Sequence, residues 1–537
     1  MNRVYRLIWN ERLNAWTVVS ELARTHGKRS GLNRSATALL LALGTGTLPA
    51  WSADLASNAL PGGGTVTAGQ ASITTSGTRM DVNQGSQKAI LNWQNFDIGS
   101  QAFVNFNQPN ASAVALNRVS GPTASRIEGQ LSANGQVFLV NPNGVIFGNG
   151  ARVNVGGLAV STLDIRDQDF LNGNYTFSGT GGAMTNLGDI NAAAGGYLAF
   201  IAPAISNYGK LNAPQGTVAM GAGENVRLNF AGDRLVGLDV SASKLDTLIE
   251  NHQAIKAEGG AILLTAAAAE GLTNSVINNT GVLEAGSLTS KGGVIRLEST
   301  LATNTGTINA SGVNGGEITV HATEVRQGGT TSATGSHGVG GTVKLLGDRV
   351  ALIDHAIVDA SGTAGGGTVL VGGDYQGKNP DIQNAQRTYV ASTATIKADA
   401  TERGDGGKVV VWADGDTRYY GNISAKGGNS AGNGGFVEVS GKQNLDFNGG
   451  VNVGATEGIG GRVLLDPQNI VLSTAVAAPP PNNPNGTPDI AFADPPAVGT
   501  TNVQISTITG FSELFLQATN DITVSNPVAM AANNSIR

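Results

Sequence analysis

The sequence contains no cysteine and few charged or aromatic side chains. Of its 537 residues, 13% are charged and 5% are aromatic. The absence of cysteine excludes disulfides and thiolate metal sites, and the low charge argues against a chain that is kept unfolded by its own repulsion. The 77 glycines follow no triplet repeat, which excludes collagen. The class of protein that remains possible has short strands between turns rich in Gly, Asn, Thr and Ser, which is typical of an all-β protein.

Basic residues are scarce outside the N-terminus. Residues 1–34 hold seven basic and two acidic side chains, which leaves 26 basic and 37 acidic side chains for the remainder. Such an acidic remainder has no electrostatic attraction for nucleic acid or for an anionic membrane. It also has no apolar run long enough to cross a bilayer. We therefore expect no nucleic-acid partner and no integral membrane span.

An export signal is predicted over residues 29–53. Basic residues, among them Arg29 and Arg34, precede an apolar run that ends in small side chains, which is the order of a secretory signal peptide. Cleavage is expected after Ser52 or after Ala53.

A further segment, residues 1–28, precedes that signal. Its apolar side chains recur at roughly helical spacing and predict a basic amphipathic helix. They are Tyr5, Trp9, Trp16, Val19 and Ala23. The segment, and its ending VVSELARTHGK in particular, resembles the extended signal peptide region of very large Gram-negative exoproteins and autotransporters. The resemblance implies export through the inner membrane and removal of the segment together with the signal.

From about residue 180 the chain repeats a short alternating strand that follows a Gly-Gly pair. These pairs begin at residues 195, 259, 292, 315, 340, 406, 434 and 460. The step is about 23 to 33 residues, with two wider gaps that correspond to two or three steps. One unit cannot bury its own apolar face, whereas stacked units share a core. We predict an all-β fold, a right-handed parallel β-helix (solenoid) with Gly and Asn at corners that need positive φ; a β-propeller is the less favoured alternative.

Residues 54–300 carry a second resemblance. The stretches QKAILNWQNFDIG and QVFLVNPNGVIFGNG are similar to the N-terminal two-partner secretion domain of the filamentous haemagglutinin family. Later stretches, ERGDGGKVVVWADG, GGFVEVSGK and GGRVLLDPQNI, resemble the high-molecular-weight adhesins and haemopexin-binding exoproteins of that family. The resemblance implies a secretion-domain cap at the N-terminal end of the β-helix. The repeat pattern itself predicts β-helix units over 301–477 and a further unit over 498–537. Its prolines predict a Pro/Asn-rich loop at 478–497, because Pro cannot donate to a ladder. The last repeat stops in mid-pattern, as expected for a truncated fragment or a short paralogue of a longer exoprotein.

Two turns match the secretion motifs of that family. One is Asn141, Pro142, Asn143 and Gly144, whose residue types also suit a β-turn. The other stands as NQPNA and includes Gln108, Pro109 and Asn110; it departs from the usual Asn-Pro-Asn followed by an apolar residue. The resemblance implies that an outer-membrane POTRA β-barrel transporter binds this domain by strand addition and threads it outward. Asn141–Gly144 is then either a β-helix corner or part of the transporter's recognition surface.

No residue pattern indicates catalysis, a metal or a cofactor. The histidines are scattered, and the acidic stretches 399–407 and 412–418 lie beside Gly-rich corners. We interpret those stretches as solvated turns and not as the clustered acids of a β-helix polysaccharide lyase. We therefore expect a non-enzymatic, secreted or cell-surface adhesin that binds a host glycan or protein. The alternative is an exoprotein that binds haem or haemopexin, or a contact-dependent toxin whose effector region lies beyond this chain.

Overall fold

The computed structural model describes residues 5–10, 15–20, 54–244, 246–267, 275–287, 292–473, 501–525 and 534–537. These residues fall into two units, 1–54 and 55–537. The expected cleavage positions Ser52 and Ala53 and the predicted loop 478–497 lie outside the described residues.

The first unit contains a β-hairpin where the sequence predicts a helix. Strand β1 (Tyr5–Asn10) pairs antiparallel with β2 (Ala15–Ser20), and Trp9 lies opposite Trp16. The prediction of an amphipathic helix is therefore wrong for these residues. Aromatic and β-branched residues dominate both segments, and such residues favour strands.

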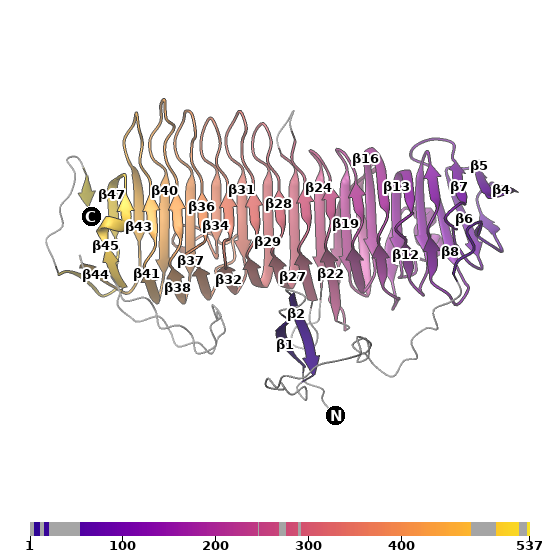
Figure 1. The fold of residues 1–537 in the computed structure, drawn as a ribbon, viewed down its shortest axis with the longest axis horizontal. Helices are drawn as coiled ribbons and strands as arrows, with labels where there is room; N and C mark the ends of the chain where they lie inside the picture. The colour runs from indigo at the N-terminus through magenta and orange to yellow at the C-terminus, as the bar shows by residue number, and fades with distance from the viewer. Residues whose placement is uncertain are drawn as a thin grey trace, which may run out of the picture. The chain divides into compact units, whose positions relative to one another are not determined.

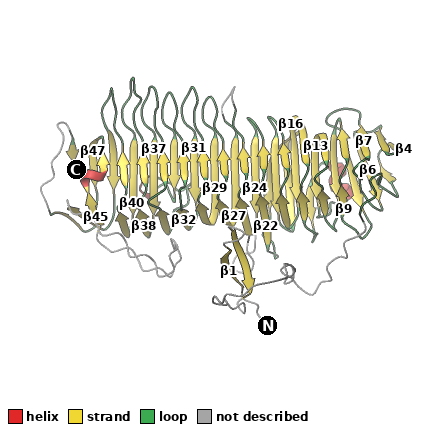
Figure 2. Ribbon diagram, viewed as in Figure 1, coloured by secondary structure: helices red, strands yellow, loops and turns green. Residues whose placement is uncertain are grey.

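The second unit is a parallel β-helix, and most of its strands belong to one sheet of 41 strands (Figures 1 and 2). Successive coils contribute one strand each to three parallel ladders, A, B and C, that run the length of the stack. Ladder A consists of β6 (Lys88–Trp93), β8 (Val114–Val119), β11 (Gln136–Val140), β13 (Arg152–Ser161), β16 (Asp189–Ile201), β19 (Thr217–Ala222), β24 (Ala261–Ala266), β27 (Val294–Asn304), β29 (Glu317–Gln327), β31 (Thr342–Leu346), β34 (Thr368–Val371), β37 (Lys408–Ala413), β40 (Phe436–Gly441), β43 (Gly461–Leu465), β47 (Phe511–Leu516) and β49 (Ser535–Ile536).

Ladders B and C complete each coil, and four long strands bend to serve two ladders. Ladder B contains β9 (Ser125–Ile127), β12 (Val145–Phe147), β15 (Met184–Asn186), β17 (Ala204–Asn207), β22 (Thr247–Asn251), β25 (Ser275–Asn279), the ends of β27 and β29, β32 (Arg349–Leu352), β35 (Arg387–Val390), β38 (Asp416–Tyr419) and β41 (Asn444–Phe447). Ladder C contains β5 (Arg79–Gln84), β7 (Phe103–Asn107), β10 (Gln130–Ala133), the starts of β13 and β16, β18 (Lys210–Asn212), β23 (Ala254–Lys256), β26 (Val282–Glu284), β28 (Thr307–Asn309), β30 (Thr330–Ser332), β33 (Ile357–Asp359), β36 (Thr395–Lys397), β39 (Asn422–Ser424), β42 (Gly450–Asn452) and β46 (Ile508–Thr509). Near the other end, β44 (Asn469–Ser473) pairs in parallel with β45 (Thr501–Gln504) and β48 (Asp521–Val524).

The N-terminal end of the stack is an antiparallel cap. Strand β3 (Thr65–Ala68) pairs antiparallel with β6, and β4 (Ala71–Ser76) pairs antiparallel with β5. The other edges of β5 and β6 pair in parallel with β7 and β8. The predicted all-β parallel β-helix with an N-terminal cap is confirmed.

Each wide gap in the Gly-Gly spacing holds one further coil. Thr217 lies in register between Tyr197 and Ala261, and Thr368 lies between Thr342 and Lys408. Inward side chains of all coils share one apolar core. A single buried aliphatic side chain contributes roughly 1.5–3 kcal/mol, so a coil gains its stability from its neighbours.

Most Gly-Gly pairs serve close packing and not a left-handed backbone. Among the first glycines of the eight pairs, positive φ occurs at Gly195 and Gly259. A Cβ on Gly340 would lie 1.8 Å from the Ala360 carbonyl oxygen in the next coil. The expectation of positive φ at all these corners is therefore wrong. Adjacent backbones come so close there that a side chain has no space.

A second apolar layer covers the outward face of ladder A in the first coils. This layer, the cover, consists of α1 (Asp167–Asn172) and the antiparallel strands β14 (Thr176–Ser178), β20 (Asn225–Ala231) and β21 (Arg234–Val240). Together with outward residues of β6, β8, β11, β16 and β19 it forms a separate apolar cluster. The first coils thus have a core on both sides of one ladder.

Candidate functional site

Strand β11 leads into the predicted Asn141–Gly144 motif, and all five of its residues are buried. Val137 and Leu139 point into the core of the β-helix, whereas Phe138 and Val140 belong to the apolar cluster beneath the cover. The Phe138 ring lies 5.8 Å from that of Phe170 in α1, centroid to centroid. Strand β11 is apolar on both faces because both of its faces are covered, one by the β-helix core and the other by the cover.

The Asn141–Gly144 segment is a hydrogen-bonded turn between β11 and β12. The Gly144 amide donates to the Asn141 carbonyl over 3.1 Å. The Asn141 side chain is buried, and its Oδ1 accepts from the Asn143 amide over 3.0 Å. Pro142 and Asn143 are exposed. The turn therefore has one buried anchor and an exposed tip.

The same turn is bonded to the coils before and after it. Asn141 Nδ2 donates to the Thr123 carbonyl and to Ser125 Oγ, each over 3.0 Å. On the other side, the Gly182 amide donates to the Pro142 carbonyl over 2.8 Å. A turn that joins three coils fixes their register, because its bonds form only when all three are in place.

The second motif lies at the opposite end of the same strand. Gln108 follows β7 and is buried, and its Nε2 donates to the Gln136 carbonyl at the start of β11 over 3.1 Å. Pro109 and Asn110 are exposed. The two motifs are therefore not brought together; they hold the two ends of β11, with Gln108 before it and Asn141 after it.

Three residues around Gln108 were not predicted. Gln108 Nε2 also donates to Gln84 Oε1 over 3.0 Å, and Tyr197 donates its hydroxyl to Gln136 Oε1 over 2.7 Å. Burial raises the pKa of Tyr197, so its hydroxyl stays a donor. The spacing of 24 residues between Gln84 and Gln108 matches the length of one coil and is a sequence signal for Gln84 only.

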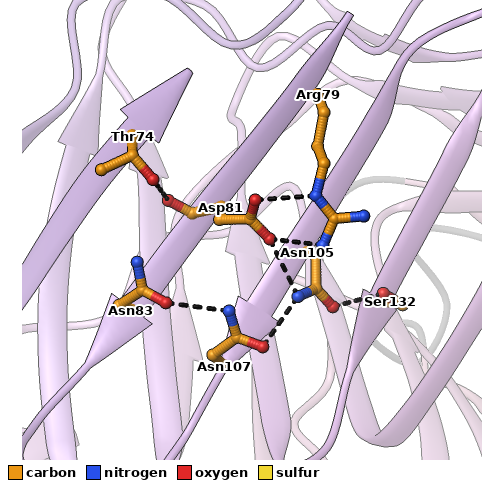
Figure 3. A network of polar contacts seen from close by, with 7 residues as sticks. All are labelled: Thr74, Arg79, Asp81, Asn83, Asn105, Asn107 and Ser132. Atoms are coloured by element: carbon orange, nitrogen blue, oxygen red, sulfur yellow. Dashed lines mark hydrogen bonds and ion pairs between the residues drawn. The ribbon is translucent and has the colours of Figure 1, made fainter. Parts of the chain in front are cut away.

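The outward face of ladder C begins with a polar network (Figure 3). Arg79 donates to both oxygens of Asp81 over 2.7 and 2.6 Å, and Asn105 Nδ2 donates to Asp81 over 3.1 Å. These hydrogen bonds lower the pKa of Asp81. Asn105 Nδ2 also donates to Asn107 Oδ1, and Asn107 Nδ2 to Asn83 Oδ1, each over 2.8 Å. This face is a hydrophilic surface beside the cap.

Charged side chains fasten the cover to the first coils. Lys88 on β6 donates to the Phe170 and Leu171 carbonyls near the end of α1, each over 2.9 Å. Arg118 on β8 pairs with Asp164 and Asp167 over 3.0 and 2.6 Å. Burial lowers the pKa of Lys88. These contacts hold the cover on β6 and β8, and β8 pairs directly with β11, which the two secretion motifs flank.

A buried ladder of amides continues from this region along ladder B. Its members end successive strands and donate, side chain to side chain, over 2.7–3.1 Å. They are Asn186, Asn207, Asn251, Asn279, Asn304 and Gln327. They were not among the predicted site residues, although four of them begin the recurring pattern Asn-x-Gly: NLGDI, NYGKL, NTGVL and NTGTI. We call this set the amide ladder.

The described residues contain no group of three or more His, Cys, Asp or Glu side chains that could hold a metal ion. Of the acidic stretches, Glu402 and Asp405 are exposed, as expected for solvated turns. Asp416 is buried, accepts from Asn444 over 2.7 Å and lies 3.8 Å from Arg387. The interpretation as a solvated turn is wrong for Asp416, because ladder B continues through it. In the parts of the chain that the structure describes, no helix is long and apolar enough to cross a membrane.

Known proteins with similar sequences or folds point to secretion. A family model described as TPS secretion domain matches residues 57–320, and one described as extended signal peptide of type V secretion systems matches residues 1–50. The crystal structure of the HMW1 secretion domain from Haemophilus influenzae superimposes with a TM-score of 0.60 at 30% identity. It covers 76% of this chain and 100% of that one.

Two curated proteins with similar sequences are both named heme/hemopexin-binding protein. A heme/hemopexin-binding protein of Haemophilus influenzae strain Rd is 34% identical over 207 residues, 37% of this chain and 23% of that protein. A second heme/hemopexin-binding protein of Haemophilus influenzae is 48% identical over 104 residues, 19% of this chain and 11% of that protein. The chain thus spans less than a quarter of the length of either relative.

Proposed function

Because this chain belongs to the two-partner secretion exoproteins, we propose that the packed region around β11 is what its outer-membrane transporter recognises, and that the exported β-helix acts as an adhesin. The match to a TPS secretion domain over residues 57–320 carries the export part of this proposal. The partner that we propose is a β-barrel with POTRA domains, which would add an edge strand to the arriving secretion domain.

Folding outside the cell would supply the energy for export. Each coil of the stack packs on the coil before it, so folding can start at the cap and proceed coil by coil. Contacts between neighbouring coils are local along the sequence, which favours rapid folding. The turn at Asn141 supports this proposal because it joins three coils near the end that emerges first.

The test of export is expression of the full chain with and without its transporter. With the transporter, the chain accumulates in the medium; without it, the chain stays in the periplasm. The measurement is the amount of chain in each fraction. Equal release in both strains would contradict the assignment of a dedicated transporter.

The adhesin role rests on the extended surface that a β-helix offers to a host glycan or protein. A second candidate, binding of haem or haemopexin, is favoured by the names of the two curated relatives. Purified chain tested against host cells, haem and haem-loaded haemopexin separates the two. Binding to cells that neither haem nor haemopexin inhibits supports the adhesin. Binding to either of them in solution supports the alternative.

A further inference from the structure

A short excursion of the chain crosses the outward face of ladder A far from the cover. Residues 372–386, here called the strap, connect β34 to β35 and include the 3₁₀ turn η1 (Tyr375–Gly377). The Tyr375 ring lies 5.7 Å from that of Phe436 on β40, centroid to centroid. Ile382 packs on an apolar cluster whose largest member is Trp412. The strap thus spans three neighbouring strands.

Both ends of the strap are held by side chains of distant coils. Gln376 Nε2 donates to Gln517 Oε1 over 2.9 Å, and Gln383 Oε1 lies 2.6 Å from His321 Nε2. Gln376 has a φ of 53°, which is an uncommon backbone state for a residue other than glycine. A Cβ on Gly377 would lie 2.7 Å from the Trp412 ring. The strap is therefore seated tightly on Trp412 in a strained conformation.

A fully buried carboxyl group lies beneath the strap. Glu438 on β40 has no exposed surface, and its two oxygens lie 3.2 and 3.1 Å from the Gln376 amide of the strap. Burial raises the pKa of Glu438 to about 7, and the negative charge of Asp466 adds to this, whereas hydrogen bonds from Gln376 and Ser440 and the charge of Lys408 act in the opposite direction. The strap therefore covers a group that titrates near neutral pH.

The other charged groups near the strap are few. Lys408 on β37 is paired with Asp374 of the strap. Burial acts to raise the pKa of Asp374, but hydrogen bonds from Asn379 and Lys408 lower it overall. Burial also raises the pKa of Asp466 after β43, against the charge of Lys378 in the strap. Asp381 lies in the strap itself, and His321 lies beside Gln383. Asp348 accepts from Gln383, and Asp414 accepts from Asn384 and Trp412. Because Lys408 is already paired, it neutralises Glu438 only in part.

We propose that the strap is a pH-sensitive closure of the outward face of ladder A, which is shut while Glu438 is protonated and loosens when Glu438 ionises. An ionised carboxylate needs water or a second charge. In the closed state Glu438 has hydrogen bonds from the Gln376 amide and from Ser440 and a Lys408 that is shared with Asp374, and these compensate its burial only in part. Loosening lets water reach the carboxylate and uncovers the apolar surface around Trp412. This inference is independent of the export pathway and of the ligand.

The direction of the pH effect follows from the two states. In the open state Glu438 titrates near its ordinary value of 4.5, and in the closed state near 7. The closed state therefore binds the proton more tightly, and its advantage is complete below about pH 4.5 and lost as pH rises through 7. Opening becomes about tenfold easier per pH unit in that window, up to roughly 300-fold in total.

The test is hydrogen exchange of the strap amides in the full mature chain, followed between about pH 5 and pH 8 and corrected for intrinsic exchange. We expect protection of residues 372–386 to fall with rising pH in the wild type. In Glu438→Gln, a neutral side chain of the same shape, protection stays high throughout. Acrylamide quenching of Trp412 in a Trp93→Phe background gives a second readout, because Trp93 is the other tryptophan after the signal peptide.

Two further variants make the outcome decisive. His321→Gln keeps the pH response if Glu438 is the responsible group, although His321 touches the strap. Asp466→Asn moves the midpoint to lower pH, since it removes a negative charge that raises the pKa of Glu438. This shift can be measured even if Glu438→Gln fails to fold. The proposal is overturned by a flat wild-type profile, by the same pH response in Glu438→Gln, or by loss of the response in His321→Gln alone.

Discussion

The side-chain amide of Asn207 donates a hydrogen bond of 2.8 Å to that of Asn251, which lies 44 residues further along the chain. Both side chains are buried and form one rung of the amide ladder. Asn251 in turn donates to Asn279 and to the Gln253 carbonyl, over 2.8 and 2.9 Å. Each arriving coil therefore satisfies a donor that the preceding coil left open.

The amide ladder predicts a sharp difference between neighbouring asparagines. Asn251→Ala removes three hydrogen bonds and leaves buried groups of Asn207 and Asn279 unpaired, so we expect a loss of about 2–4 kcal/mol in the free energy of unfolding. Asn278→Ala, at an outward position one residue from the ladder, should cost less than about 1 kcal/mol. Urea unfolding of both variants measures the difference. Equal losses would show that the ladder contributes no net stability.

The Asn141–Gly144 turn predicts different roles for its two asparagines. Asn141→Ala removes a buried anchor, so we expect lower unfolding stability, by about 2–3 kcal/mol, together with reduced secretion. Asn143 is exposed, and its side chain donates to the Gly121 carbonyl over 2.8 Å. Asn143→Ile should cost about 1 kcal/mol or less if the turn acts as a corner alone.

Thermal unfolding and secretion of these variants must be measured together. Lost secretion of Asn143→Ile at unchanged melting temperature would assign the exposed tip to transporter recognition. Loss of both properties in Asn141→Ala alone would assign the turn to the folding of the first coils. Normal secretion of both variants would remove the turn from the export mechanism.

The apolar residues on the two sides of this turn differ in their surroundings. Phe138 is fully buried beneath the cover, whereas Ile146 is 38% exposed. We expect Phe138→Ala to lower the unfolding free energy by about 3–5 kcal/mol. Ile146→Ala should lower it by less than about 1 kcal/mol. Chemical denaturation of the purified secretion region checks both values, and similar losses would mean that the cover does not pack on β11.

Close packing at the Gly-Gly pairs predicts a strong effect of a single methyl group. In Gly340→Ala the new Cβ would meet the Ala360 carbonyl oxygen at 1.8 Å, so the coils must separate locally. We expect a loss of about 3 kcal/mol or more. Gly237→Ala is the matched control, since its nearest atom would lie 3.8 Å away. The unfolding free energy of Gly237→Ala should change by no more than about 0.5 kcal/mol. Differential scanning calorimetry of both variants measures the difference.

Much of the fold could be predicted from local patterns. The alternating strands after each Gly-Gly pair place one apolar face toward a common core, and Asn-Pro-Asn-Gly carries its turn preference in four adjacent residues. The antiparallel strands 5–10 and 15–20 were mispredicted as helix, because aromatic and apolar residues at a loose helical spacing also fit two short strands.

The candidate site was predicted only in part. The two secretion motifs were found, but Gln84, Gln136 and Tyr197 around Gln108 were not. Their bonds join residues 24 to 61 positions apart, so they are defined by the register of successive coils. That register depends on the exact length of each coil, and the irregular repeat does not give it in advance.

The sequence by itself determined the export signal, the class of fold and the position of the Asn141 turn, because each depends on residues that are close together in the chain. The tertiary structure alone decided which outward side chains are buried. Phe138 and Glu438 both point away from the core of the β-helix. Phe138 is covered by Phe177, 39 residues later in the chain, and Glu438 is covered by Gln376, 62 residues earlier. Burial of such residues is a property of the assembled coils, since it requires the cover and the strap to meet faces that other parts of the sequence build.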